Sequence, residues 1–383
     1  MFTPLRIIHV VNVRWYNATA WYGLSLAELL VRAGHEVRVL ALPDTEPWEK
    51  ARGAMGSASI GININSANVF STIRSFFLIR NLVREFRPHI VNCHRGEGMP
   101  FWGMLKGLGG GFALVRTRGD QRPPRVNPVN RYLYARMADA VIATNSGTER
   151  QCAGLGVPAS RLHCIPGGVD RRFFSPDPEG RAHVRAQYGF GDKDVVVGLL
   201  GRFDPVKGHR ELLDAFAAVR AKAGGRYSSL RLMLMGFPAN ISLEGMRAML
   251  QERDLGDCCR ITGKVDNVAA HINAMDLGVI ASVGSEAIAR AAFEIMSCGV
   301  PLIGTDVGVM PDLLSRDALV PVGDAGALAG LLQRTAFEPD FARGLAARQA
   351  ARMSGFSHEA FLESTLSVYR QALALRRAAW DAT

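Results

Sequence analysis

The sequence predicts an α/β protein made of two domains, each a doubly wound parallel sheet with helices on both faces. Short runs rich in β-branched residues alternate with stretches of helical periodicity along almost the whole chain. The runs are continuously apolar, which is typical of strands that are covered on both faces. The length of 383 residues suits two domains of ordinary size.

The first half of the chain predicts one series of strands. They are expected at residues 5–11, 36–42, 89–93, 113–118, 140–144 and 162–166. Helical periodicity lies between them, most clearly at residues 23–32 and 71–86. Because helices alternate with the strands, the sheet is expected to be parallel.

The second half predicts another series of the same kind. Its strands are expected at residues 195–201, 230–235, 260–263, 277–281, 301–305 and 319–321, with helices at 208–222, 268–275 and 287–298. A stretch rich in proline and glycine, residues 166–191, separates the two series. The predicted domains are therefore residues 1–170 and 171–357, with a helix in residues 358–383 expected to pack back on the first domain.

Charge and cysteine content narrow the class of protein. The 45 basic and 35 acidic residues give a net charge of +10, which fits either a soluble basic protein or a protein whose partner carries phosphates. No basic stretch is interleaved with aromatic residues, so a nucleic acid is not expected as a partner. The six cysteines form no CxxC pair and no cluster with zinc spacing, which predicts free thiols in the cytoplasm. Neither a signal peptide nor a membrane-spanning run is expected.

Two cationic residues follow the first strand of the second series. Arg202 and Lys207 stand in a short loop, and a helix is expected to begin near Gly208. Cations beside a helix N-terminus make a good phosphate site, because the arginine forks onto two oxygens and the lysine adds a compact charge. The alternative is that both are solvated surface residues.

Two glutamates follow the strand at residues 277–281. Seven residues separate Glu286 from Glu294, so on one helix their Cα atoms would lie ~12 Å apart along the axis. That separation is too long for the carboxylate pair of a glycoside hydrolase and fits two grips on one long ligand. Glu294 stands in an apolar pattern, which favours a ligand or a basic partner; a structural salt bridge is the alternative.

These motifs resemble the retaining, GT-B-fold, family 4 nucleotide-sugar glycosyltransferases. Four segments match in order over nearly the whole chain. They are residues 88–94, ending in His94; the linker 165–170 with Phe174; Gly201-Arg202 with Lys207-Gly208; and Glu286 and Glu294 followed by residues 298–306. The resemblance implies two facing Rossmann-like domains with the site in an inter-domain cleft.

The resemblance also implies roles for residues of this chain. Arg202 and Lys207 would hold the donor diphosphate, and Glu294 would bind the ribose hydroxyls of the nucleotide. Glu286 would lie near the transferred sugar, and His94 at the junction of donor and acceptor. The chemistry implied is retention without a metal or another cofactor. Its main catalytic contribution would be cationic stabilisation of the leaving diphosphate.

The chain departs from the family pattern at three loops. After the first strand the usual glycine pair is absent, and Asn17 stands in that segment. The usual Gly-Phe-Gly after the first glutamate is Ala287-Ile288-Ala289, whose backbone amides remain as donor contacts. The later glycine pair is Gly308-Val309. The identity of the donor sugar therefore cannot be copied from other members.

Several residues keep two interpretations. Asn17, Arg118 and Asp120 are expected on the acceptor side. Arg118 either pairs with Asp120 or holds an acidic acceptor. Trp15, Tyr16, Trp21 and Tyr22 either pack in the core, which is favoured, or stack on a sugar. Residues 100–106, with Arg118, Arg122 and Arg125, either dock on an anionic membrane or form a covered helix and a solvated loop. Asp192 and Asp194 resemble a metal-binding DxD motif but precede their strand, so no metal site is expected.

The expected function is transfer of a sugar from a nucleotide diphosphate sugar to a hydroxyl. The acceptor expected is a lipid-linked or lipopolysaccharide-type glycan, in cell envelope polysaccharide biosynthesis at the cytoplasmic face of the inner membrane. A nucleotide-sugar epimerase and a non-catalytic nucleotide-sugar binding protein are the alternatives. A dehydrogenase is disfavoured because no G-x-G-x-x-G fingerprint follows the first strand.

Overall fold

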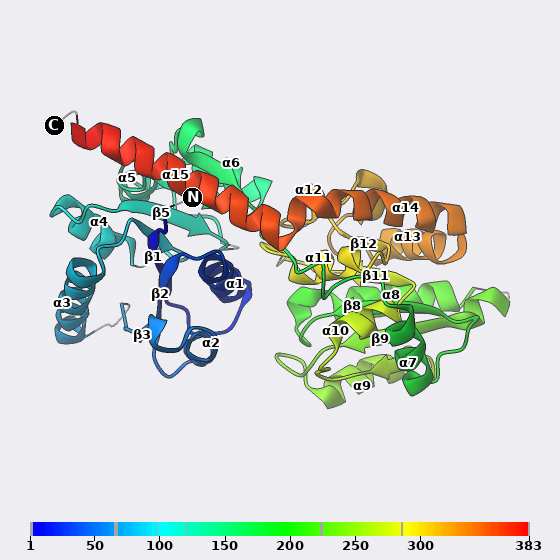
Figure 1. Ribbon diagram of the computed structural model, residues 1–383. Helices are drawn as coiled ribbons and strands as arrows, with labels where there is room; N and C mark the ends of the chain where they lie inside the picture. Colours follow the sequence, from blue (N-terminus) through cyan, green and yellow to red (C-terminus); the bar gives the residue numbers. More distant parts are fainter. Residues whose placement is uncertain are drawn as a thin grey trace. The chain divides into compact units, whose positions relative to one another are not determined.

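The computed structural model describes residues 3–64, 68–96, 98–120, 122–222, 225–284 and 286–381. The chain divides into two compact units (Figure 1). Unit 1 comprises Met1–Gly167 and His358–Thr383, and unit 2 comprises Gly168–Ser357. The boundary that the sequence suggested, between residues 170 and 171, lies close to this division.

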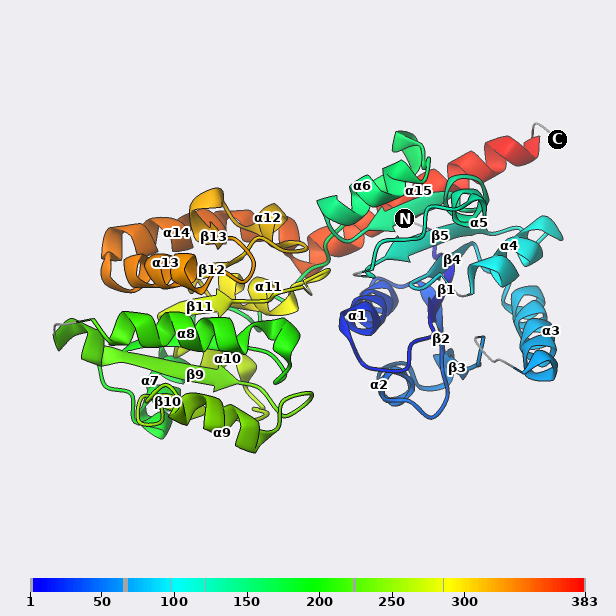
Figure 2. The same cartoon turned by 180° about the vertical axis from the view of Figure 1, so that it is seen from behind.

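Unit 1 contains a seven-stranded parallel sheet in the order β3-β2-β1-β4-β5-β6-β7. Its strands are β1 (Arg6–Val11), β2 (Glu36–Ala41), β3 (Ser59–Gly61), β4 (Ile90–Cys93), β5 (Ala113–Arg118), β6 (Ala140–Ala143) and β7 (Leu162–Cys164). Its α-helices are α1 (Ala18–Arg32), α2 (Glu46–Met55), α3 (Val69–Phe86), α4 (Met99–Gly107), α5 (Pro128–Tyr132), α6 (Ser146–Gly154) and α15 (His358–Asp381). The long α15, red in Figures 1 and 2, brings the end of the chain back beside β5 and α1.

Unit 2 contains a six-stranded parallel sheet in the order β10-β9-β8-β11-β12-β13. Its strands are β8 (Val195–Leu200), β9 (Leu230–Met235), β10 (Cys259–Ile261), β11 (Leu277–Ile280), β12 (Leu302–Thr305) and β13 (Leu319–Val320). Its α-helices are α7 (Pro178–Tyr188), α8 (His209–Arg220), α9 (Leu243–Gln251), α10 (Val268–Asn273), α11 (Arg290–Ser297), α12 (Met310–Leu313), α13 (Ala325–Phe337) and α14 (Pro339–Arg352).

The predicted fold class is confirmed, and each predicted strand is present with ends that differ by a few residues. The pattern missed β3, because a strand of three residues is too short to show periodicity. Helix α1 begins five residues before the predicted start at residue 23, since Asn17 caps it by accepting a hydrogen bond from the Ala20 amide.

Glu286 and Glu294 do not share a helix, and the helix that holds Glu294 begins later than the predicted start at residue 287. Helix α11 begins at Arg290, so Glu286 lies in the loop before it and only Glu294 is helical. The apolar periodicity of the segment extended the prediction to residue 287, but the chain between Glu286 and Ala289 forms a bend. A separation calculated along one helix axis therefore does not apply to this pair.

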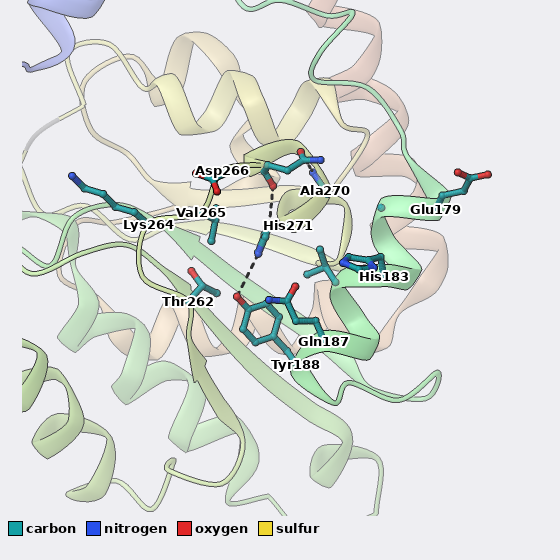
Figure 3. A pocket seen from close by; sticks show the side chains of 13 residues that line it. Glu179, His183, Gln187, Tyr188, Thr262, Lys264, Val265, Asp266, Ala270 and His271 are labelled. Carbon is teal, nitrogen blue, oxygen red and sulfur yellow. Dashed lines mark hydrogen bonds between the residues drawn. The ribbon is translucent and has the colours of Figure 1, made fainter. Parts of the chain in front are cut away.

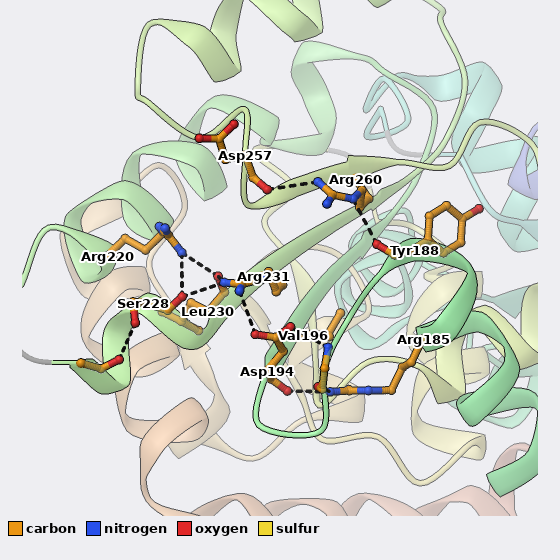
Figure 4. A network of polar contacts seen from close by, with 12 residues as sticks. Arg185, Tyr188, Asp194, Val196, Arg220, Ser228, Leu230, Arg231, Asp257 and Arg260 are labelled. Carbon is orange, nitrogen blue, oxygen red and sulfur yellow. Dashed lines mark hydrogen bonds and ion pairs between the residues drawn. The ribbon is translucent and has the colours of Figure 1, made fainter.

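Charged residues at the amino-terminal ends of β8 and β9 form a structural network (Figure 4). Asp194 accepts from Arg231 at 3.0 Å, and its backbone carbonyl accepts from Arg185 at 2.7 Å. Arg220 donates to the Leu230 carbonyl at 2.8 Å. Asp194, the second aspartate of the DxD-like motif, thus links β9 and α7 to the start of β8, at the amino-terminal ends of the strands.

Among the residues that the structure describes, no helix combines the length and the apolar character needed to cross a bilayer.

Candidate functional site

The carboxyl ends of β8 and β11 place the two predicted motifs side by side in unit 2. These strands are neighbours in the sheet, and the strand order reverses between them because β9 lies on the other side of β8. Such a switch point is where open parallel sheets bind ligands. The loop 201–208 follows β8, and the loop that leads to Glu286 follows β11.

Lys207 and Glu286 form an ion pair at this edge. The Lys207 Nζ lies 2.6 Å from the Glu286 Oε1, and the Ser282 hydroxyl donates to the same oxygen at 2.5 Å. The Glu286 side chain is 5% exposed and the Lys207 side chain 22% exposed. Lysine carries three N–H donors, so the ammonium can bind Glu286 and still offer donors to a ligand. The alternative of a fully solvated lysine is therefore wrong.

Two glycines, Gly208 and Gly308, allow the loops around Lys207 and Glu286 to pack closely against neighbouring backbone. Gly208 has φ +70°, and a Cβ there would lie 1.8 Å from the Ala281 carbonyl oxygen. Gly308 has φ +62°, and a Cβ there would lie 2.0 Å from the Glu286 carbonyl oxygen, which accepts a hydrogen bond from the Val309 amide. Both contacts are with backbone, so a side chain at either position would force the loops apart.

Arg202 is oriented by a buried aspartate that sequence reasoning missed. The Arg202 Nε donates to the Asp204 Oδ2 at 3.0 Å, and Asn240 donates to the same oxygen at 2.9 Å. Burial alone would raise the pKa of Asp204, but hydrogen bonds from the Val206 amide, Arg202 and Asn240 hold that pKa below its ordinary value. Asp204 is therefore a stable anion that anchors one side of the guanidinium, while the Arg202 side chain stays 45% exposed.

Glu294 has a different partner from Glu286. The Arg290 Nε lies 2.5 Å from the Glu294 Oε1, one turn earlier on α11. Burial raises the pKa of Glu294, and the charge of Arg290 offsets part of that effect. Arg290 is thus the basic partner in this structure, and an ion pair within one helix is also what the alternative of a structural salt bridge predicts. Between the two glutamates, Ala287 lies in the bend, and Ile288 and Ala289 are buried.

In unit 1, His94 lies at the end of β4 and is fully buried. Its Nε2 is 2.9 Å from the His9 Nδ1, and the two rings are stacked. Burial, together with the nearby His9 and Arg116, lowers the pKa of His94 well below 6.5. His94 is thus a neutral imidazole inside unit 1, and its role at a donor–acceptor junction stays a prediction.

The ring signals of His94 are expected to stay constant in a nuclear magnetic resonance titration from about pH 8 to about pH 5.5. The reason is that the lowered pKa keeps the folded protein from binding the proton that the unfolded chain binds near pH 6.5. The contribution of His94 to the free energy of unfolding is then fully present above that pH. It is lost as the pH falls, by up to about 1.4 kcal/mol per pH unit. The urea-unfolded chain is the control, and a His94 signal that titrates with it would contradict the assignment.

The residues predicted for the acceptor side, Asn17, Arg118 and Asp120, all have partners within unit 1. Arg118 lies 3.5 Å from Asp120, as the pairing interpretation predicts, and Arg116 of the same segment lies 2.9 Å from the same oxygen. Asn17 uses its side-chain oxygen as the cap of α1.

The aromatic cluster divides between the two interpretations. Tyr22 is buried and donates to the Ile165 carbonyl at 3.0 Å, as the core interpretation predicts. Trp15 is 76% exposed, so the core interpretation is wrong for it. On α4, Trp102 is fully buried, which supports a largely covered helix over residues 100–106.

A separate pocket of unit 2 lies between α7 and the segment after β10 (Figure 3). Its volume is about 700 Å³, and the Tyr188 hydroxyl lies 3.4 Å from the His271 Nε2 within it. None of the predicted site residues belongs to its described lining. In the described part of the chain, no three histidine, cysteine or acidic side chains gather in a way that suits a metal ion.

Comparison with protein families places both units in known groups. Residues 194–336 match the model of "Glycosyl transferases group 1", and residues 20–173 match that of "Glycosyltransferase Family 4". A D-inositol 3-phosphate glycosyltransferase of Kineococcus radiotolerans is 27% identical over 279 residues, covering 68% of this chain and 64% of the relative. A GDP-mannose-dependent alpha-(1-6)-phosphatidylinositol monomannoside mannosyltransferase of Mycobacterium tuberculosis is 28% identical over 55% of each chain. The match spans less than two thirds of the length of these curated relatives.

Solved structures show the same fold at low sequence identity. A glycosyltransferase from Rickettsia africae has a TM-score of 0.84 and 17% identity, covering 97% of this chain and 99% of that one. The Anabaena protein HepE, solved in complex with UDP and glucose, has a TM-score of 0.79 and 16% identity, covering 95% and 98%.

Proposed function

This chain belongs to glycosyltransferase family 4, and on that premise we propose that it transfers a sugar from a nucleotide diphosphate sugar to a hydroxyl group. The observation that carries the proposal is the Lys207–Glu286 pair beside Arg202 at the switch point of the unit 2 sheet. Two cations there suit a diphosphate, and the buried Glu286 carboxylate, which is paired with Lys207, suits a sugar hydroxyl.

The residues of unit 2 divide the donor between them in this proposal. Lys207 and Arg202 bind the diphosphate, with Asp204 fixing the plane of the Arg202 guanidinium. Glu286, held by Ser282 and Lys207, accepts a hydrogen bond from the transferred sugar. Negative charge grows on the leaving diphosphate as the glycosidic bond breaks, so preformed cations lower the barrier to that step.

The proposed stereochemistry is retention without a metal. The acceptor hydroxyl attacks from the face that the phosphate leaves; the new C–O bond forms as the old one breaks, and the hydroxyl proton passes to a leaving phosphate oxygen. Lys207 and Arg202 supply the charge that a divalent cation would otherwise supply. The anomeric configuration of the product, read by nuclear magnetic resonance, and full activity in the presence of a chelator test both parts.

The acceptor proposed is an anionic glycan, polyol or lipid-linked saccharide. Relatives of the chain are named for acceptors that carry phosphate, namely inositol 3-phosphate and a phosphatidylinositol mannoside. The net charge of +10 favours such a partner. The six cysteines are free, which fits the reducing cytoplasm, and we place the reaction there or at the inner face of the membrane in envelope polysaccharide synthesis.

The test is a thermal-shift screen of the full chain against UDP and GDP sugars, followed by product analysis with the best donor. A bound donor stabilises the folded state by mass action. Transfer to an added acceptor supports the proposal. A changed sugar in the absence of acceptor supports an epimerase instead, and donor binding without turnover on any acceptor supports a binding protein.

In this proposal Glu294 accepts hydrogen bonds from the ribose hydroxyls of the nucleotide. Glu294→Gln is therefore expected to weaken binding of the nucleoside diphosphate about tenfold, since hydrogen bonds to a charged group contribute about 1.5–3 kcal/mol. The substitution keeps the shape of the side chain, so the fold should remain. Calorimetric titration with UDP and GDP measures the change. Glu338→Gln is the matched control, because Glu338 pairs with Arg334 at the same i,i+4 spacing on an exposed surface. Equal affinities of the two variants would remove Glu294 from the nucleotide site.

A further inference from the structure

Unit 1 contains a strongly cationic pocket that the donor chemistry does not use. It has a volume of about 750 Å³ and lies at the carboxyl ends of β4 and β5, beside the short π-helix η2 (Leu133–Met137). Its described lining carries one carboxylate and five guanidinium groups. They are Asp120 and the arginines Arg95, Arg116, Arg118, Arg122 and Arg125.

The pleat of β5 explains why two of these arginines meet. Residues two apart on a strand point to the same face, so Arg116 and Arg118 both face η2, where Arg118 donates to the Tyr134 hydroxyl at 2.9 Å. Thr117 faces the other side and donates to Asn92, which in turn donates to Tyr369 of α15. The two charges are therefore aimed into the pocket by the strand itself.

Arg116 and Arg118 are two buried positive charges that share one negatively charged side chain. Arg116 is 0% exposed and Arg118 is 5% exposed, and they share the single carboxylate of Asp120 at 2.9 and 3.5 Å. The Nε of each is buried without a hydrogen-bond partner among the described residues. Burying a charge is costly unless it is paired, so the pocket is set up to receive a second anion.

The loop at residues 122–125 adds cations at the mouth. Arg118 donates to the Arg122 carbonyl, and Asn130 donates to the Arg125 carbonyl at 2.7 Å, so the loop backbone is held against the pocket wall. The side chains of Arg122 and Arg125 are exposed. Their charges lie where an entering anion would meet them first.

We propose that this pocket binds the phosphate group of the acceptor, so that the acceptor class is a phosphorylated sugar, polyol or lipid headgroup. Guanidinium groups bind phosphate oxygens in a bidentate manner, and several of them around one site favour a doubly charged group over a neutral sugar. The inference rests on the proposed transferase function for the name "acceptor". The binding itself needs only unit 1, so its failure can be told apart from failure of the donor site.

The first experiment measures binding of inorganic phosphate to the full chain by calorimetry at low ionic strength. It is done in a Lys207→Ala background, so that the cations of the donor site contribute less. The double variant Arg122→Gln/Arg125→Gln changes only exposed side chains and should fold. Its affinity for phosphate is expected to fall about tenfold or more, as for the loss of a hydrogen bond to a charged group.

Arg136→Gln is the matched control, because Arg136 is an exposed arginine of η2 outside the lining of this pocket. It should bind phosphate as the parent protein does. Equal affinity of the double variant and this control would overturn the proposal.

Asp120→Asn is expected to change phosphate affinity in the opposite direction. Removal of the carboxylate in the pocket should tighten phosphate binding. Unchanged or weaker binding in a folded Asp120→Asn variant would also overturn the proposal.

The second experiment distinguishes the sources of the phosphate. Glucose 6-phosphate serves as a soluble phosphomonoester, and sedimentation with vesicles of phosphatidylcholine and phosphatidylglycerol serves as the lipid arm. If Arg122→Gln/Arg125→Gln weakens binding of glucose 6-phosphate but not of the vesicles, the pocket is assigned to a soluble phosphorylated acceptor. If it weakens binding of the vesicles only, the pocket is assigned to a lipid headgroup. Unchanged binding of both rejects the proposal.

Discussion

Lys207→Ala is expected to lower kcat/KM for sugar transfer by a factor of about 10²–10³ and to abolish the thermal stabilisation by the donor. The ammonium is a compact charge at the switch point of the unit 2 sheet, 2.6 Å from the Glu286 Oε1. Its removal takes away a preformed cation from the leaving diphosphate. The measurement is steady-state transfer with the donor found by the screen, alongside a melting curve with and without that donor.

The stability of this variant has to be read together with its activity. Glu286 keeps its hydrogen bond from Ser282 but loses its cation, so some loss of stability is expected without loss of the fold. Lys193→Ala is the control, because Lys193 is exposed and precedes β8, whereas Lys207 follows it. Full activity of Lys207→Ala in the folded state would defeat the assignment of the diphosphate site.

Gly208→Ala is expected to destabilise unit 2 and to remove donor binding together. Both Gly208 and Gly189 follow a helix or turn with nearly the same left-handed backbone, φ 70° and ψ 32° for Gly208 and φ 70° and ψ 31° for Gly189. An alanine pays about 1–2 kcal/mol for that conformation at either position. Only at Gly208 does the added Cβ meet backbone, 1.8 Å from the Ala281 carbonyl oxygen, whereas at Gly189 nothing lies within 4 Å.

The comparison of the two alanine variants therefore isolates the contact that holds the site. The clash should cost Gly208→Ala a further ~1–3 kcal/mol, as overpacking does, and should shift the loop that carries Lys207. Urea unfolding gives the free-energy difference, and calorimetry with the donor gives the binding. Equal stability of the two variants, or normal donor binding by Gly208→Ala, would show that the loop adapts without using this close approach.

The sequence predicted the positions of the strands and of the two motifs well. Buried parallel strands are continuously apolar, so their ends are visible, and Arg202, Lys207 and Glu286 stand just beyond such ends. Family resemblance added their expected roles. The prediction failed where periodicity carries little information: the short strand β3 and the start of α11, where the chain before Arg290 is apolar without being helical.

Some partners of the site residues were not visible in the sequence. Asn240 is distant from Asp204 in the chain, yet it donates to the same Asp204 oxygen as Arg202 does. The pairing of Arg118 with Asp120 was one of two predicted interpretations, but the sharing of that carboxylate with Arg116 was not predicted. Such contacts follow from how loops return to a common edge, and local patterns do not specify that return.

The amino-acid sequence by itself determined the α/β class, the division into two units and the residue types available for binding a diphosphate, because these depend on local periodicity and composition. Only the tertiary structure decided that β11 lies next to β8, which brings Glu286 onto Lys207 across seventy-nine positions of the chain. It also placed η2 beside β5, so that the Tyr134 hydroxyl contacts Arg118 and the two buried arginines of β5 line one pocket. The physical reason is that strand order and strand face are set by the packing of the whole sheet, in which the burial of every strand is decided together.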